Sequence, residues 1–142
     1  MRMLTLDDHL FSEIAETNDI AFNEEERAPH GILREQCNRG EVFVIERVGR
    51  VVSFAIVTER FLSPYIWSIA TDPNFRGQGY AGQLLDEIEA WARQENKVFI
   101  FLTTHENNPA QKLYFDKGYR VLKVVGDYYL SGNGLLMRRK LL

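Results

Sequence analysis

The chain has 142 residues, of which 45% are hydrophobic and 26% are charged, and its formal net charge is −3. Such a length matches one globular domain, which can bury a core without a disulfide or a metal. The composition excludes a disordered or fibrous protein, and the small negative charge excludes a strongly basic nucleic-acid-binding domain. We therefore expect residues 1–142 to form a single domain that binds no nucleic acid.

Other features of the composition predict a cytoplasmic protein that does not enter a membrane. Cys37 is the single cysteine and can form no internal disulfide, which fits a reducing compartment. The first eight residues include acidic side chains before any apolar core of signal-peptide length, and no stretch approaches the roughly 18 apolar residues of a membrane span. The three histidines lie far apart, so we expect no metal site. A monomer or a homodimer fits equally well.

The first half of the chain predicts two helices and then an antiparallel hairpin. Apolar residues recur at helical spacing over residues 8–22, and residues 32–37 indicate a second, shorter helix. The runs at 42–46 and 51–57 are rich in β-branched and aromatic residues, and Gly49 lies between them. This pattern is typical of two paired strands with a tight turn near the glycine.

The second half alternates strands and helices. The expected elements are a buried strand at 65–71, a glycine-bearing loop at 76–82, an amphipathic helix from Leu84 to Trp91, a strand at 98–103, a short helix at 110–117 that ends at Gly118, and strands at 119–125 and 135–139. The order predicts a mixed α/β (α+β) domain with one central sheet, in which the strands at 65–71 and 98–103 run parallel. Trp67 and Trp91 are expected to pack between sheet and helices.

The loop between the strand at 65–71 and the following helix carries the clearest chemical signal. Gly77, Gly79 and Gly82 have no Cβ, so an anion can approach the main chain where a helix begins and its first amides lack partners. Arg76 adds a guanidinium suited to a phosphate. The loop therefore predicts a pyrophosphate site, although a purely structural glycine loop would also fit the pattern.

Two common nucleotide motifs agree less well with this loop. A P-loop requires a lysine and a serine or threonine after its last glycine, but Gln83 and Leu84 follow Gly82. The run from Gly77 to Gly82 does match Gly-x-Gly-x-x-Gly. In a dinucleotide-binding fold, however, that pattern follows the first strand of a doubly wound sheet. A nucleotide-binding protein therefore stays the weakest of the hypotheses.

Three segments resemble signatures of the GNAT superfamily of acyl-CoA-dependent N-acyltransferases. Residues 76–81 read RGQGYA and are similar to the family's R/Q-x-x-G-x-G/A. Residues 69–73 read IATDP and resemble the end of its fourth strand. Residues 107–119 are similar to its second signature, N-x-x-A-x-x-L-Y-x-x-x-G-F, with Tyr119 in the last place. The resemblance implies a mostly antiparallel central sheet with splayed fourth and fifth strands and flanking helices.

The same resemblance implies an acetyl-CoA-dependent N-acetyltransferase that needs no metal. Its expected coenzyme A-binding residues are Ile69, Ala70, Thr71, Arg76, Gly77, Gln78, Gly79, Tyr80, Ala81, Gly82 and Asn107. The loop amides would hold the pyrophosphate, the main chain near Ile69 and Thr71 would pair with the pantetheine arm, and Asn107 would also bind that arm. A backbone amide near Ala70 or Thr71 would stabilise the oxyanion of a tetrahedral intermediate.

Tyr114 corresponds to the family's general acid, which protonates the departing thiolate. The general base is not evident, because the strands at 65–71 and 98–103 carry no glutamate. The candidates are Glu59, His105, Glu106, the run at 24–26, and a water relay, which we favour. This departure from the family pattern leaves a non-catalytic relative open.

The amine acceptor is expected between residues 18–35 and a loop at 127–134. Acidic side chains at 24–26 and Asp127 could attract an ammonium group, and Tyr128 and Tyr129 could flank a peptide or a small amine. The paired tyrosines resemble the branch that acetylates N-terminal alanine of proteins. The acceptor is therefore either a protein N-terminus or a small amine, and the alternative function is a non-catalytic acetyl-CoA-sensing module that binds a protein partner.

Overall fold

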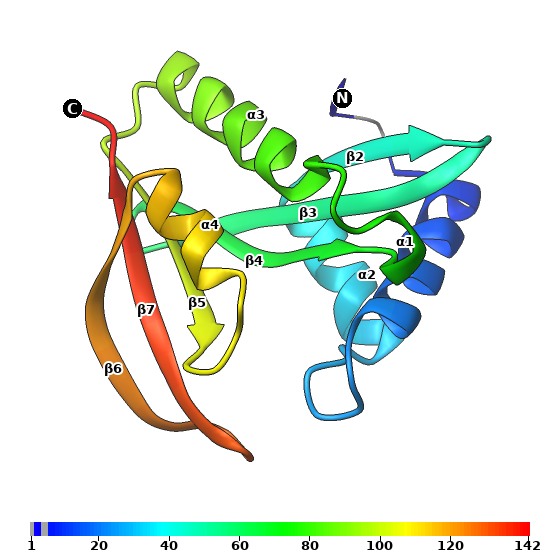
Figure 1. The fold of residues 1–142 in the computed structure, drawn as a ribbon. Coiled ribbons are helices and arrows are strands. Elements are labelled where there is room, and N and C mark those ends of the chain that lie inside the picture. Colours follow the sequence, from blue (N-terminus) through cyan, green and yellow to red (C-terminus); the bar gives the residue numbers. More distant parts are fainter. Residues whose placement is uncertain (1, 4–5) are drawn as a thin grey trace.

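The described part of the chain forms one seven-stranded sheet in a computed structural model, with helices on both faces (Figure 1). The structure describes residues 2–3 and 6–142, so the expectation about the first eight residues lies partly outside it. The strands are β1 (Arg2–Met3), β2 (Glu41–Arg47), β3 (Arg50–Arg60), β4 (Ser63–Thr71), β5 (Phe99–His105), β6 (Tyr119–Tyr129) and β7 (Gly132–Lys140). The helices are α1 (Asp8–Ala21), α2 (His30–Arg39), α3 (Tyr80–Gln94) and α4 (Gln111–Asp116), with a 3₁₀ turn at Pro73–Phe75.

The strand order across the sheet is β1-β2-β3-β4-β5-β7-β6. Neighbouring strands are antiparallel except for β4 and β5, which are parallel. The predicted mixed fold with a mostly antiparallel sheet is therefore confirmed. None of the described helices is both long and apolar enough to cross a membrane.

Two apolar cores lie on opposite faces of the sheet. On one face, α3 contributes Leu84 and Ile88 to a cluster that also contains side chains of α4 and β7. On the other face, α1 and α2 contribute Ile14 and Leu33, which pack with Phe54 of β3. The helical spacing of these apolar residues thus corresponds to burial against the sheet, as the sequence predicted.

The last two hairpins extend further than the sequence indicated. β3 and β4 meet at Phe61 and Leu62, which both have positive φ, and β6 continues to Tyr129. The expected loop at 127–134 was wrong: strand pairing continues to Tyr129 and Gly132, so the chain turns within two residues. A tight turn of this kind keeps the cross-strand side chains paired up to the tip.

A β-bulge interrupts β4 in the middle of the sheet. Val57 pairs with Ile66 and Ile56 pairs with Ser68, which leaves Trp67 as an extra residue on β4. β4 also pairs with β5 over only two residue pairs near its beginning. Bulges bend a strand and re-aim the residues that follow, so the carboxyl ends of β4 and β5 are splayed, as expected.

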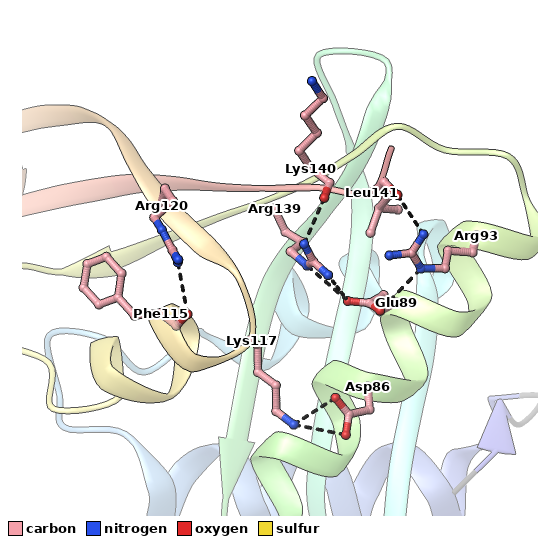
Figure 2. Close-up of polar contacts among 9 residues, drawn as sticks. All are labelled: Asp86, Glu89, Arg93, Phe115, Lys117, Arg120, Arg139, Lys140 and Leu141. Carbon is pink, nitrogen blue, oxygen red and sulfur yellow. Dashed lines mark hydrogen bonds and ion pairs between the residues drawn. The ribbon is translucent and has the colours of Figure 1, made fainter.

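Ion pairs fix α3 against α4 and β7 (Figure 2). Lys117, which follows α4, binds Asp86 of α3 at 2.9 Å, and Arg139 of β7 binds Glu89 of α3 at 3.1 Å. Asp86 is exposed and the other three side chains are partly exposed, so water screens both contacts and each contributes modestly to stability. They keep the beginning of α3 next to α4, and these two elements flank the clefts described below.

Candidate active site

An uncapped helix N-terminus faces a cleft of about 530 Å³. Gly79 is the N-cap of α3 at φ +81° and supplies no capping side chain, and Gly77 has φ +79°. The first hydrogen bond of α3 is donated by the amide of Gln83 to the carbonyl of Gly79, at 3.0 Å. The amides before Gln83 thus precede the intrahelical ladder, where the helix dipole favours an anion.

Gly82 differs from the two glycines before it. Its φ is not positive, and an added Cβ would meet Lys117 and Leu113 at 3.5 and 3.6 Å, which are ordinary contacts. A Cβ at Gly77 or Gly79 would meet nothing within 4 Å, so those two positions favour glycine through backbone conformation alone. The expected loop at 76–82 was therefore too long: α3 begins at Tyr80, so Gly82 lies within the helix, and only Gly77 and Gly79 form the left-handed turn.

The polar side chains of the loop form hydrogen bonds within the protein. The Arg76 guanidinium donates to the carbonyl of Ala21, the last residue of α1, at 3.0 Å, and so ties the loop to the opposite wall of the cleft. The Tyr80 hydroxyl donates to Gln78 Oε1 at 3.1 Å. Ala81 lines the cleft beside them. Arg76 was expected to point at an anion, but in this structure its guanidinium binds a helix C-terminus.

A second cleft, of about 610 Å³, fills the gap between the splayed strands. Ile69, Ala70, Thr71 and Asn107 all line it, so the structure brings these predicted residues together. The amide of Asp72 donates to Val52 on β3, and backbone groups alternate in direction along a strand. The polar groups of Ile69 and Thr71 therefore point away from β3 into the cleft, whereas those of Ala70 point toward β3.

Tyr114 lies where this cleft meets a smaller one of about 220 Å³. Its side chain projects from α4 and is 5% exposed, with the ring 6.3 Å from that of Tyr119. Burial, reinforced by the negative charge of Glu26, raises the pKa of Tyr114 to about 12. The phenol is therefore protonated at neutral pH and is able to donate a proton.

Three of the predicted base candidates are unsuited to that role. His105 Nδ1 accepts from the Asn107 amide at 3.0 Å, and its Nε2 lies 2.8 Å from Ser131 Oγ, so both ring nitrogens are engaged. Glu106 accepts a hydrogen bond from the Asn133 amide. Glu59 is exposed and lines none of the three clefts.

The acidic run at 24–26 divides into three different environments. Glu24 is exposed, and Glu25 accepts from the Ser131 amide at 2.6 Å. Hydrogen bonding by the Ser131 side chain, and then by its backbone, lowers the pKa of Glu25 below its usual value. Glu26 is half-buried and lines both of the clefts that Tyr114 lines. A carboxylate and a protonated phenol thus share one junction, while Glu25 joins the α1–α2 segment to the tip of the β6–β7 hairpin.

The smaller cleft has a largely aromatic wall. Tyr65, Trp67, Tyr128 and Tyr129 line it, and the rings of the last two lie 4.9 Å apart. Asp127, which was expected here, lines none of the three clefts. Trp67 packs on the α1–α2 core as predicted but also reaches this wall.

The sequence analysis did not single out Tyr65 or Ser131. Tyr65 lies in an apolar strand, and its sequence context indicates an ordinary core residue. In the structure its hydroxyl donates to Thr103 on the adjacent strand β5, at 2.6 Å. Ser131 lies at the hairpin tip and meets Glu25 across 106 positions. Neither contact follows from local spacing, although the polar atom on Tyr65 required a partner.

The chain matches a known family and several known proteins. Residues 9–119 match the model described as the acetyltransferase (GNAT) family. The chain is 28% identical over 85 residues to a [ribosomal protein bS18]-alanine N-acetyltransferase of Haemophilus ducreyi. That match covers 59% of this chain and 59% of the relative, so it spans less than two-thirds of the relative's length.

Solved structures with the same fold extend the likeness to nearly the whole chain. The ribosomal-protein-S18-alanine N-acetyltransferase of Escherichia coli superposes with a TM-score of 0.87 at 18% identity, over 99% of this chain and 93% of that one. A chain from the NatC complex bound to Gag peptide and CoA superposes with a TM-score of 0.81 at 21% identity, over 100% of both chains. At these identities the likeness concerns the fold.

Proposed function

This chain belongs to the acetyltransferase (GNAT) family, and from that premise we propose that it transfers an acetyl group from acetyl-CoA to the N-terminal amine of a polypeptide. The proposal rests on the junction of the two clefts of about 610 and 220 Å³: Tyr114 and Glu26 each line both of these clefts. One cleft leads toward the uncapped start of α3, and the other ends at paired tyrosines. A donor and an acceptor can therefore approach the same two side chains from opposite directions.

The donor side has the chemical features that coenzyme A requires. The amides from Gly77 to Gly82 would hold the pyrophosphate, because they have positive character and no capping side chain competes for them. The free backbone groups of Ile69 and Thr71 would pair with the pantetheine amides as an added strand does, and Asn107 lies on the same wall. When bound, acetyl-CoA would supply an acetyl thioester that is activated toward an amine.

Tyr114 and Glu26 would divide the proton transfers. Glu26, directly or through a water molecule, would take a proton from the acceptor ammonium, so that the neutral nitrogen can form the new C–N bond. Tyr114 would give its proton to the sulfur as the C–S bond breaks, and the second proton that the nitrogen loses as the amide forms would return to the phenolate. The raised pKa of Tyr114 keeps that proton available, and an amide of Ile69 or Thr71 would stabilise the oxyanion.

The acceptor side favours a polypeptide α-amine over a compact small amine. The smaller cleft lies between the α1–α2 segment and the β6–β7 hairpin, and its aromatic wall can flank a chain that enters from outside. Glu26 lines both this cleft and the larger one, so its carboxylate would attract an ammonium group to the place where they meet. The H. ducreyi relative is named for the acetylation of an N-terminal alanine, which supports this choice.

The proposal is tested by incubating the protein with acetyl-CoA and two acceptor sets, one of peptides with different first residues and one of polyamines and amino sugars. Thiol release measures turnover, and mass spectrometry of the peptides locates the acetyl group. We expect acetylation at the α-amine. Binding of acetyl-CoA without turnover on either set would favour the non-catalytic sensing module, and turnover on small amines alone would contradict the choice of acceptor.

A further inference from the structure

A patch of aromatic and cationic side chains lies on the face of the sheet opposite α4, next to the smaller cleft. We call it the basic aromatic patch, and its members are Arg60, Phe61, Tyr65, Phe99, Phe101 and Arg138. α1 and α2, which cover this face elsewhere, pack on β2, β3 and β4. Phe61 is 63% exposed and Arg60 is also exposed, whereas Tyr65 and Phe101 are buried beneath them. The patch therefore reaches solvent through Arg60 and Phe61.

Three rings of the patch, Phe61, Phe101 and Phe99, form a row of contacts, and a guanidinium lies over a ring near each end of the patch. The Arg60 guanidinium lies 4.4 Å from the Tyr65 ring, and that of Arg138 lies 4.6 Å from the Phe99 ring. Phe101 links the two ends: its ring is 6.0 Å from that of Phe99 and 5.2 Å from that of Phe61, and the strand register pairs Phe101 with Tyr65. Stacking orients the guanidinium planes and leaves their N–H groups free for an anion.

The charged side chains of the patch are two arginines, and two lysines lie near them on the neighbouring strands. Among the described residues, neither Arg60 nor Arg138 makes an ion pair with a carboxylate, whereas Arg50 and Arg139 do. The strand register places Lys140 beside Phe99 and Lys123 beside Leu136, and both lysines are exposed. This local excess of positive charge contrasts with the net charge of −3 of the whole chain.

The patch is continuous with the proposed acceptor site. Tyr65 belongs to both: its ring lies under Arg60, and it lines the smaller cleft where its hydroxyl donates to Thr103 at 2.6 Å. A polypeptide whose first residue occupies the cleft would leave it alongside Tyr65. The residues that follow would then cross the basic aromatic patch.

We infer that the basic aromatic patch binds the segment that follows the acceptor's N-terminal residue, and that it selects segments rich in aspartate and glutamate. Carboxylates match the planar guanidinium forks of Arg60 and Arg138, and apolar side chains between them can pack on Phe61. This inference rests on the proposed function and adds the substrate class. The charges of the basic aromatic patch affect the rate at which a peptide is encountered and which peptide is selected, whereas the clefts hold the reacting groups.

The test compares peptides that share a first residue and differ in the next five positions, which are acidic, neutral or basic. Three series begin with alanine, serine or methionine. The kcat/KM is measured for the wild type, for Arg60→Gln/Arg138→Gln, for Arg60→Glu/Arg138→Glu, and for the control Arg39→Gln. Arg39 is an exposed arginine on α2 outside the clefts. Binding of labelled single-stranded RNA is measured for the same proteins.

We expect the wild type and Arg39→Gln to prefer acidic over neutral peptides by about tenfold at low salt, and less at 0.5 M salt because the charges are screened. The Gln pair should bring the ratio near one, and the Glu pair should invert it toward basic peptides. Peptide acetylation without an acidic preference, or a preference that survives both double variants, would overturn the inference while the proposed function stands. Loss of RNA binding in the double variants with the peptide ratio unchanged would likewise overturn it. If no peptide is acetylated, the proposed function itself fails.

Discussion

Replacement of Tyr114 by phenylalanine removes the hydroxyl group and keeps the packing of the ring, so it tests the hydroxyl alone. Among the described residues, no hydrogen bond is recorded for the Tyr114 hydroxyl, so its removal should change the free energy of unfolding by less than about 1 kcal/mol. Loss of the proton donor should lower kcat about a hundredfold, which corresponds to about 2.7 kcal/mol of transition-state stabilisation. The affinity for acetyl-CoA should stay within about twofold.

The pH dependence provides an independent check on the same residue. With a pKa near 12, only about one Tyr114 phenol in ten thousand is ionised at pH 8, so the rate should show no alkaline loss from this group below about pH 10. Because the pKa is raised in the folded protein, the associated stability is fully present below pH 10 and is lost as the pH rises through 12. Tyr114→Phe should therefore lose less stability than the wild type over that interval.

Tyr119→Phe is the matched control for these measurements. Tyr119 is 2% exposed and packs against Tyr114, and its hydroxyl is buried without a hydrogen-bond partner among the described residues. It lines none of the three clefts. Thiol-release kinetics and urea unfolding should find this variant as active as the wild type and at least as stable. A Tyr114→Phe enzyme with kcat within threefold of wild type would refute the assignment of the acid.

Three further substitutions test the surroundings of the site. Glu26→Gln should lower kcat by tenfold or more in the thiol-release assay with unchanged acetyl-CoA affinity, whereas Glu24→Gln should have little effect, and equal rates for the two would exclude Glu26 as the base. Gly79→Ala should cost about 1–2 kcal/mol in urea unfolding because of its positive φ, whereas Gly82→Ala should be neutral or slightly stabilising, and the reverse order would show that the loop is misplaced. Asp72→Ala should destabilise the protein by about 2–3 kcal/mol, since it strands the Arg50 guanidinium that now binds Asp72 at 2.8 Å, and an unchanged urea midpoint would contradict this.

Local sequence patterns were sufficient for the elements whose signal is carried by neighbouring residues. The apolar spacing around Leu84 and Ile88 predicted α3, because one helical face must be buried. The glycines at 77 and 79 predicted the turn before it, because few other residues adopt positive φ. Tyr114 was identified through its place in a signature, which carries information that periodicity alone does not contain.

The candidate base shows where sequence reasoning could not reach. Glu24, Glu25 and Glu26 are consecutive and chemically equivalent in the sequence, yet only the packing of the α1–α2 segment against the β6–β7 hairpin distinguishes them. His105 was a reasonable candidate until the structure placed hydrogen-bond partners at both of its nitrogens. Such distinctions depend on contacts between residues distant in the chain, which no local pattern encodes.

The sequence by itself thus determined the order of helices and strands from residue 8 onward, although it missed β1, and it determined the position of the glycine turn. Each of these depends on residues within one or two turns of chain. The tertiary structure alone decided that β4 bulges at Trp67 and separates from β5, and that Glu26 rather than its neighbours reaches the junction. It also decided that Arg60 and Arg138 lie over rings of the same patch. The physical reason is that strand register and helix docking set which distant side chains share a surface, and both are fixed by burial of the whole core.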